Sequence, residues 1–284
     1  MGNDVMMHFD AKTLCPTMTK DEIRTKAPYI FAEAPTRKSV SDRYVFANTE
    51  TIIDDMEKLG WGVTDCKQQR ATKKQTGKSF HMVAFQNPDV YIENDEGGIE
   101  GFVRIILTNS HDGFHSFKFM VGVYRCICSN GLIIASERFA DISIRHINYD
   151  FEELRKIVAQ AISASEKNVD IINDMRETKL TGNQKAEFAK KAIAIRKGVE
   201  VEELPKMTDK EVEAILEPVR NEDKGDDVWA VFNVLQEKVI KGDFTFGTTK
   251  KGKARKARPI TGAAKDIEVN QRLFETATSY LVAA

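Results

Sequence analysis

The sequence predicts an α+β protein in which an antiparallel β-sheet or meander with a flanking helix is followed by a C-terminal helical region. Two observations lead to this class. Between residues 61 and 147, short segments rich in β-branched and aromatic residues alternate with turn signals. From Asn148 onward, apolar residues recur every three to four positions instead. The change of period predicts an N-terminal α+β domain over residues 1–148 and a helical region over residues 149–284.

One helix is expected before the strands, within NTETIIDDMEKLGWGV (residues 48–63). Its apolar side chains recur at helical spacing: Ile52, Ile53, Met56 and Leu59. Asn48 or Thr49 would cap the helix, and Gly60 would end it.

Four β-rich segments follow: SFHMVAFQ (79–86), GFVRIILTNS (101–110), SFKFMVGVYRCICS (116–129) and LIIASERFADISIRHI (132–147). In the third, alternation puts Phe117, Phe119, Val121, Val123, Arg125 and Ile127 on one face and Lys118, Met120, Gly122, Tyr124, Cys126 and Cys128 on the other. Turns are expected at residues 87–89, 94–98 and 111–113, which hold NPD, NDEGG and HDG. The pattern predicts an antiparallel, mostly buried sheet.

The helical region begins with one long helix over residues 149–180, for which Asp150 and Glu153 form a plausible capping box. Four further helices are expected over 181–198, 207–219, 226–242 and 266–283. Between the last two lies DFTFGTTKKGKARKARPITGAAK (243–265), which we interpret as an exposed, mobile basic loop with little that could pack.

The composition is that of a globular chain. With 284 residues, 42% of them hydrophobic and 30% charged, the chain can bury a core, which excludes a disordered, fibrous or disulfide-built protein. No run approaches the roughly 18 apolar residues of a transmembrane helix, and the first residues do not resemble a secretion signal. The four cysteines, at positions 15, 66, 126 and 128, are too scattered for a disulfide framework. We expect a cytoplasmic protein with reduced thiols, no membrane contact and no cofactor.

Two histidines and two cysteines fall close together in NSHDGFHSFKFMVGVYRCICSNG (residues 109–131). Cys126 and Cys128 have the spacing of a strand rather than of a zinc knuckle, and His111 and His115 flank a predicted hairpin tip. At 3.3 Å per residue, the strand puts the thiols on the order of 30 Å from that tip. The spacing therefore favours packed thiols and tip histidines over a metal site.

An enzyme is a further alternative. A catalytic cysteine needs a nearby base and a partly exposed, electropositive setting, which a strand interior does not offer. No P-loop, GxSxG, HExxH or GxGxxG pattern occurs, so a protein without catalytic activity is favoured. The enzyme alternative would use His111, Asp112, His115 or the cysteine pair Cys126 and Cys128, and it predicts tightly bound metal.

The strongest functional signal is the basic segment TKKGKARKARP, in which six cations stand among small residues without an acidic one: Lys250, Lys251, Lys253, Arg255, Lys256 and Arg258. A second basic stretch, KQQRATKKQTGK, lies in a predicted hairpin loop: Lys67, Arg70, Lys73, Lys74 and Lys78. Because the net charge is only -1, such clusters rather than the total charge would bind a polyanion, by following phosphates and releasing counterions. Candidate aromatic residues for base stacking are Phe80, Phe114, Phe244 and Phe246. The alternative is two solvated loops that aid solubility.

Arg104 and Arg125 lie within predicted strands, where a buried arginine needs partners. They are either paired structurally or line a functional face of the sheet, and structural pairing is favoured.

Several stretches together are typical of one family: VSDRY (40–44), LGW (59–61), NSHDG (109–113), GVYRCICSNGL (122–132) and VWAVFNVLQE (228–237). From about residue 40 to 280, the chain resembles the phage- and plasmid-type proteins grouped as domain of unknown function nine-three-two. The resemblance implies an origin in a mobile element and brings no known catalytic residue. A fainter likeness, in the order of helix, β-meander and long helix, is to phage single-strand annealing proteins.

The basic segments and the resemblance together predict a non-enzymatic phage protein that binds nucleic acid in the cytoplasm of its host. Single-stranded DNA binding or annealing during recombination or replication is expected, possibly by a homo-oligomeric ring or filament. The alternative is an interaction protein that inhibits a host defence or housekeeping factor.

Overall fold

The computed structural model describes residues 11–33, 46–69, 80–93, 98–111, 117–125, 131–132, 150–242, 244–248 and 254–281. The chain divides into two compact units, residues 1–165 and 166–284. The division falls inside the long helix α5 (Phe151–Glu177), whereas the boundary predicted from the sequence precedes that helix. Each unit buries its own set of apolar side chains.

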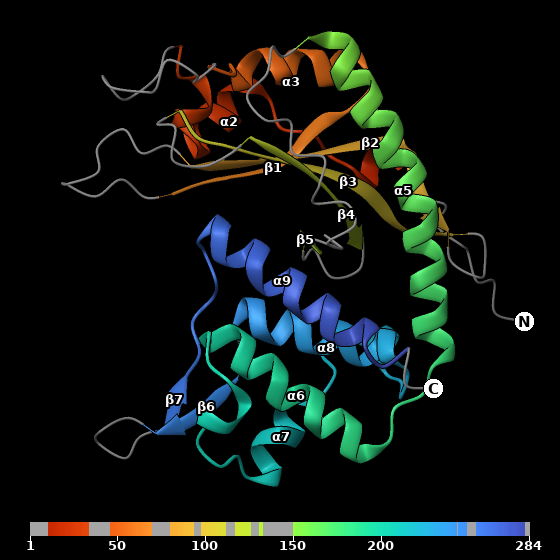
Figure 1. Cartoon of the computed structure of the whole chain (residues 1–284), viewed down its shortest axis with the longest axis vertical. Coiled ribbons are helices and arrows are strands. Elements are labelled where there is room, and N and C mark those ends of the chain that lie inside the picture. Colours follow the sequence, from red (N-terminus) through yellow and green to blue (C-terminus); the bar gives the residue numbers. More distant parts are fainter. Residues whose placement is uncertain are drawn as a thin grey trace, which may run out of the picture. The chain divides into compact units, whose positions relative to one another are not determined.

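Unit 1 contains a five-stranded antiparallel sheet (Figure 1). Its strands are β1 (Gly62–Gln68), β2 (His81–Glu93), β3 (Ile99–Asn109), β4 (Lys118–Arg125) and β5 (Gly131–Leu132). The order β1-β2-β3-β4-β5 follows the chain, and every neighbouring pair is antiparallel, so the sheet is a meander. The predicted α+β class is therefore confirmed. The strand predicted over 132–147 lies, beyond Leu132, outside the described residues.

The helical elements of unit 1 before the sheet are α1 (Ala11–Leu14), α2 (Lys20–Lys26), the 3₁₀ turn η1 (Pro28–Phe31) and α3 (Thr49–Lys58). Helix α3 begins as predicted, because the Asn48 side chain accepts hydrogen bonds from the backbone N–H groups of Glu50 and Thr51 at 2.9 and 3.2 Å. It ends next to Gly60, whose φ of 83° is the left-handed conformation that glycine adopts most readily.

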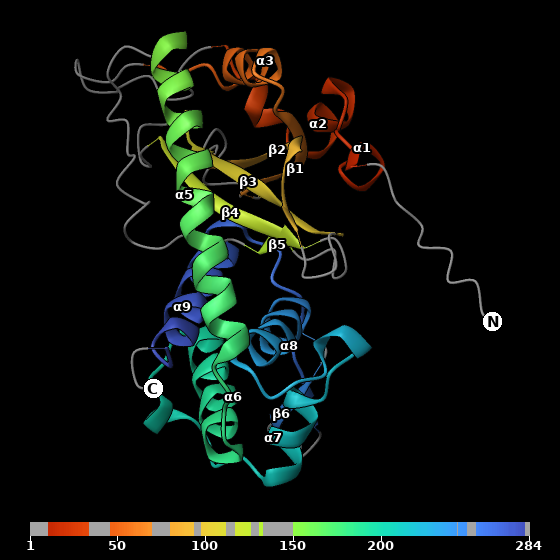
Figure 2. The ribbon, with the colours of Figure 1, turned by 90° about the vertical axis from the view of Figure 1, so that its right-hand side faces the viewer.

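The core of unit 1 lies between one face of the sheet and its helices. Phe117, Phe119 and Val121 all belong to this core, as the alternation in β4 predicts. Ile52, Ile53 and Met56 from α3 and Leu154 and Ile157 from α5 complete it. Figures 1 and 2 show α3 and the first part of α5 on this same side of the sheet.

The strands differ from the sequence-based expectation in two places, one strand that was not named and one turn that is wrong. Strand β1 was not among the predicted segments, because a register shift between Val63 and Asp65 interrupts its alternation of apolar and polar residues. The NPD turn (87–89) lies inside β2, where the register with β3 shifts between Gln86 and Tyr91. The local turn signal is real, since the Asn87 side chain accepts from the Asp89 backbone N–H at 2.9 Å, but it produces a bulge within a continuing strand.

Unit 2 is built mainly of helices and confirms the predicted helical region. It contains the end of α5, then α6 (Gly182–Lys197), η2 (Val201–Glu203), α7 (Asp209–Leu216), η3 (Asn221–Asp223), α8 (Val228–Lys241), β6 (Thr245–Thr248), β7 (Ala254–Lys256) and α9 (Ala263–Thr278). Every residue of α8 from Val228 to Val239 is buried, which is typical of a central helix. Helices α6, α7 and α9 pack against α8 (Figure 1).

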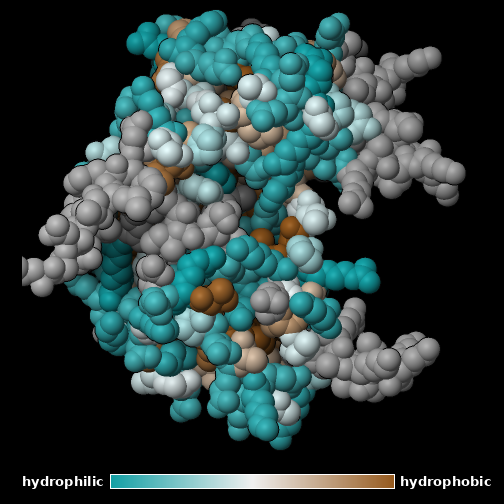
Figure 3. Space-filling model, turned by 180° about the vertical axis from the view of Figure 1, so that it is seen from behind, coloured by the Kyte–Doolittle hydropathy of each residue, from teal (hydrophilic) through white to brown (hydrophobic). Residues whose placement is uncertain are grey.

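Among the described residues, no helix combines the length and the apolar character needed to cross a membrane. The face of the molecule in Figure 3 is largely hydrophilic where its residues are described, with small and separate hydrophobic areas.

Candidate nucleic-acid interface

The main basic segment is carried by a β-hairpin of unit 2. Strands β6 and β7 pair antiparallel, with Thr245 opposite Lys256 and Thr248 opposite Ala254, so residues 249–253 connect the two strands. The interpretation of residues 243–265 as one loop with little that packs is therefore wrong. Seven of these residues form the two strands, the last three begin α9, and the Phe244 side chain is only 7% exposed.

Arg196, in the last turn of α6, holds the base of this hairpin. Its guanidinium donates hydrogen bonds to the backbone carbonyls of Val239 in α8 and Arg258 just after β7. The same guanidinium lies over the Phe244 ring, with 5.8 Å between its central carbon and the ring centroid. Burial lowers the pKa of Arg196, yet an arginine stays protonated at neutral pH. One half-buried cation thus joins a helix to both ends of the hairpin.

The backbone at the base of the hairpin is also closely packed. The Ala257 N–H donates to the Phe244 carbonyl at 2.9 Å, and the Ile260 N–H donates to the Ile240 carbonyl at 2.8 Å. Helix α8 ends at Gly242, whose φ is 73°. A Cβ at Gly242 would lie 2.5 Å from the carbonyl carbon of Arg258, so only glycine lets the two chain segments approach this closely.

The structure describes the side chains of two of the six cations predicted in this segment. Lys256, at the end of β7, and Arg258, just beyond it, are exposed to solvent. The backbone of Arg255 lies in β7, whereas Lys250, Lys251 and Lys253 lie outside the described residues. No acidic residue occurs in the sequence from 244 to 265. The positive charge is therefore concentrated on one hairpin.

The second basic segment belongs to unit 1. It connects β1 to β2, which pair antiparallel, so the predicted hairpin connection is confirmed. Of its predicted cations, Lys67 lies in β1 itself rather than in the connection. The other four lie outside the described residues: Arg70, Lys73, Lys74 and Lys78. A groove formed by both basic segments stays a prediction.

Two of the four aromatic residues considered for base stacking are buried. Phe244 and Phe80 are 7% and 8% exposed, so both rings are packed inside the protein. Phe114 lies outside the described residues, as does the side chain of Phe246. The described part of the hairpin therefore offers charge rather than stacking platforms.

His111 follows the end of β3, at the start of the predicted hairpin connection to β4, and its side chain is fully buried. Its ring centroid lies 4.9 Å from those of His81 and Phe46. Thr49 at the start of α3 links this pair to the helix, because its hydroxyl lies 2.9 Å from His81 Nε2 and accepts from the Asn109 amide at 3.0 Å. This cluster ties α3 to the sheet and is a structural feature.

The cysteines and metal-binding candidates give no catalytic arrangement within the described residues. Cys15 and Cys66 are buried, and burial raises the pKa of each thiol to about 11, so neither is a ready nucleophile. No group of three or more histidine, cysteine, aspartate or glutamate side chains in this part of the chain could hold a metal ion. Asp112, His115, Cys126 and Cys128 lie outside it.

Arg104 is hydrogen-bonded to a neighbouring side chain and also lines a cavity. It is 5% exposed, donates from Nη2 to the Gln86 side-chain oxygen at 2.9 Å, and lies over the Tyr124 ring at 4.4 Å from its centroid. A cavity of about 250 Å³ adjoins these three side chains. Arg125 is the last residue of β4, and its side chain lies outside the described part.

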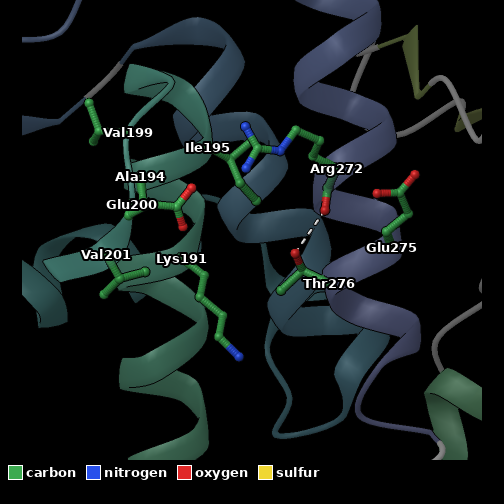
Figure 4. Close-up of a pocket in the computed structure, with 9 residues that line it drawn as sticks. All are labelled: Lys191, Ala194, Ile195, Val199, Glu200, Val201, Arg272, Glu275 and Thr276. Atoms are coloured by element: carbon green, nitrogen blue, oxygen red, sulfur yellow. Dashed lines mark hydrogen bonds between the residues drawn. The ribbon is translucent and has the colours of Figure 1, made fainter. Parts of the chain in front are cut away.

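Unit 2 has a second cavity, of about 310 Å³, between α6, η2 and α9 (Figure 4). Lys191 and Arg272 approach it from α6 and α9, and Glu200 and Glu275 contribute two carboxylates. The Thr276 hydroxyl donates to the Arg272 backbone carbonyl at 2.7 Å, within α9. Because these charges balance, the cavity favours neither sign of ligand.

With this geometry established, the comparisons with known proteins decide the family. A family model described as Domain of unknown function (DUF932) matches residues 37–274, which is most of the chain. The chain belongs to the DUF932 family. The resemblance seen in the sequence is therefore confirmed, and the matched range contains the sheet, the hairpin and most of α9. An origin in a bacteriophage is not part of this match and stays a prediction.

Two curated relatives of this DUF932 chain come from Escherichia coli (strain K12). UPF0380 protein YfjQ is 26% identical over 267 residues, which cover 93% of this chain and 92% of the relative. UPF0380 protein YafZ is 26% identical over 274 residues, with the same shares covered. No solved structure matches.

Sequence reasoning missed the residues of this DUF932 protein that hold the base of the hairpin and orient Arg104 at the cavity. Arg196 looks like an ordinary basic residue at a helix end, a position where it interacts favourably with the helix dipole. Gln86 gives no signal beyond its place in a strand. For Gly242, the signal was present, because a glycine directly after a helix indicates a left-handed cap.

Proposed function

We propose that this DUF932 protein binds nucleic acid, and single-stranded DNA in particular, through the β6–β7 hairpin, without catalysing a reaction. The observation that supports the proposal most is a cluster of cations on a hairpin whose base is held by Arg196 and Gly242. An anchored base lowers the entropy lost when the cations are ordered on a phosphate backbone. DNA recombination or replication in a mobile element, such as a phage in the host cytoplasm, is the process that this binding would serve.

The mode of binding follows from the character of the hairpin. The packed rings of Phe80 and Phe244 supply no stacking surface, so phosphate contacts carry the affinity. Such contacts release counterions and do not identify bases. We therefore expect weak sequence preference and a steep dependence of affinity on salt concentration.

Fluorescence anisotropy with a labelled single-stranded oligonucleotide tests the proposal. One variant changes the six hairpin cations to glutamine: Lys250, Lys251, Lys253, Arg255, Lys256 and Arg258. A matched control changes six exposed cations elsewhere to glutamine: Arg155, Lys156, Lys197, Lys206, Lys210 and Lys224. The two variants have the same net charge, so they separate the position of the charges from their total.

The expected result is binding that weakens as salt is added, with the affinity largely lost in the hairpin variant and nearly retained in the control. For single strands, each phosphate contact contributes roughly 0.7 to the slope of log affinity against log salt, so six contacts contribute about 4. Equal losses in both variants would assign the binding to total charge. No binding by the wild-type protein at micromolar concentration would refute the proposal and favour a host protein as the partner.

A further inference from the structure

The cavity beside Arg104 has the features of a binding site for a small ligand. It lies on the sheet face opposite the core, since Val103 and Ile105, which flank Arg104 in β3, both point into the core. Its wall comes from four adjacent strands: Thr64 and Asp65 in β1, Gln86 in β2, Arg104 in β3 and Tyr124 in β4. The segment after α1 forms part of the rim, and α1 itself lies against β2 (Figure 2).

The Arg104 guanidinium is held in one orientation. The Gln86 side-chain oxygen accepts a hydrogen bond from its Nη2 at 2.9 Å, and the Tyr124 ring lies against its flat face at 4.4 Å. A planar guanidinium fixed in this way presents its charge and donors in a defined geometry, which suits the oxygens of a carboxylate or a phosphate. The site is therefore already arranged before any ligand binds.

Gln86 supplies a second, independent observation. The residue is 1% exposed, and its Nε2 has no hydrogen-bond acceptor within the described part of the chain. Because Oε1 is used by Arg104, the amide orientation is fixed, and Nε2 has to be a donor. A buried donor without an acceptor is unfavourable. An oxygen of a ligand in the cavity, which Gln86 lines, would supply the missing acceptor.

The charges and the size of the cavity define the ligand class. Its one described carboxylate, on Asp65, is already paired with Lys26 at 2.5 Å, so Arg104 gives the wall a positive character. Leu14 and Pro16 add apolar surface for the body of the ligand. The volume of about 250 Å³ is below the range of roughly 300–1,000 Å³ that holds drug-sized ligands.

From these features, we propose that the cavity binds the oxyanion group of a small organic acid, with Arg104 and Gln86 as the donors. A carboxylate and a phosphate share the required oxygen acceptors. This site is independent of the hairpin and does not rest on nucleic-acid binding.

The test uses the full chain with three probes at constant ionic strength: sodium acetate, sodium benzoate and inorganic phosphate. Two readouts are recorded on the wild-type protein, namely the melting temperature and the NMR shifts of the Gln86 side-chain amide and the Tyr124 backbone amide. A ligand at ten times its dissociation constant raises the melting temperature of a domain of this size by about 3–5 °C. We expect such a rise with at least one probe, together with shifts of both NMR signals, and the responding probe distinguishes carboxylate from phosphate.

The discriminating variant is Gln86→Glu, which keeps the shape of the side chain, removes both N–H donors and adds a negative charge beside Arg104. We expect it to weaken probe binding at least tenfold. The matched control is Gln69→Glu, which places the same charge at an exposed position just after β1 and should leave probe binding unchanged.

Three outcomes would overturn the proposal: no response of the wild-type protein to any probe, equal responses in the wild type and Gln86→Glu, or NMR shifts confined to residues outside the cavity. If Gln86→Glu does not fold, the wild-type NMR shifts decide the question alone, because they report directly on the two residues.

Discussion

The hairpin of unit 2 and the cavity of unit 1 use the same kind of side chain in opposite surroundings. On the hairpin, Lys256 and Arg258 are exposed to solvent, while the partly buried Arg196 of α6 holds its base by donating to backbone carbonyls. In the cavity, Arg104 itself is buried and is oriented by Gln86 and Tyr124. Exposed cations attract a polyanion at long range and are screened by salt, whereas a buried and oriented one selects geometry.

The hairpin and the cavity require different support from the rest of the fold. The hairpin needs a firm base and leaves its charges in solvent, so its ligand contacts are interchangeable. The cavity needs particular neighbours on particular strands, because desolvated charges depend on specific partners. Changes to the supporting residues should therefore separate the two regions experimentally.

The largest effect is expected from Arg196→Ala. This change removes two charge-assisted hydrogen bonds and leaves the carbonyls of Val239 and Arg258 without this donor, so the free energy of unfolding should fall by about 3–4 kcal/mol. Urea denaturation measures the loss. The neighbouring exposed cation gives the control, since Lys197→Ala should change stability by less than about 0.5 kcal/mol. An equal effect of both changes would show that Arg196 does not hold the hairpin, and anion binding at the Arg104 cavity should be unaffected by either.

A slightly smaller effect is expected from Gly242→Ala, with Gly198→Ala as its matched control. Both glycines end helices with positive φ, of 73° and 70°. A Cβ at Gly198 would approach only the flexible end of Lys265, at 3.7 Å, so that change should lower stability by about 1 kcal/mol through backbone strain alone. At Gly242 the Arg258 backbone stands in the way, and a total loss of about 2–3 kcal/mol is expected. Equal losses in thermal denaturation would contradict the close packing at the base of the hairpin.

The smallest effect concerns pH and the carboxylate one turn before the end of α8. Glu237 is 7% exposed and accepts hydrogen bonds from Arg220 at 2.8 Å and Lys241 at 2.6 Å. Burial alone would raise the pKa of Glu237, but the hydrogen bonds and charges of Arg220 and Lys241 together lower it below its ordinary 4.5. Because the pKa of Glu237 is lower in the folded state than in the unfolded state, its contacts with Arg220 and Lys241 stabilise unit 2 above pH 4.5. This stabilisation is lost as the pH falls through the folded-state pKa.

Glu237→Gln should therefore lower stability at pH 7 by about 2 kcal/mol and flatten the acid limb of the stability curve below pH 5. Denaturant titrations over a range of pH would measure both effects. An unchanged acid limb in the variant would show that Glu237 does not contribute this stabilisation.

Much of the fold follows from local patterns. The cap at Asn48, the alternation of Phe117, Phe119 and Val121, and the six predicted helices all rest on interactions within a few residues. Prediction failed where a strand departs from simple alternation. The bulge in β1 and the internal turn of β2 are recognised only when the pairing of each strand with its neighbour is known.

The sequence by itself determined the α+β class, the meander, the helical region and the presence of a basic segment, because composition and periodicity are properties of short stretches of chain. Only the tertiary structure decided that this segment is a hairpin held by Arg196, that His111 is buried, and that Arg104 meets Gln86 and Tyr124 beside a cavity. These features join residues up to 62 positions apart in the sequence. Contacts at such separations depend on strand pairing and helix packing, which local pattern does not specify.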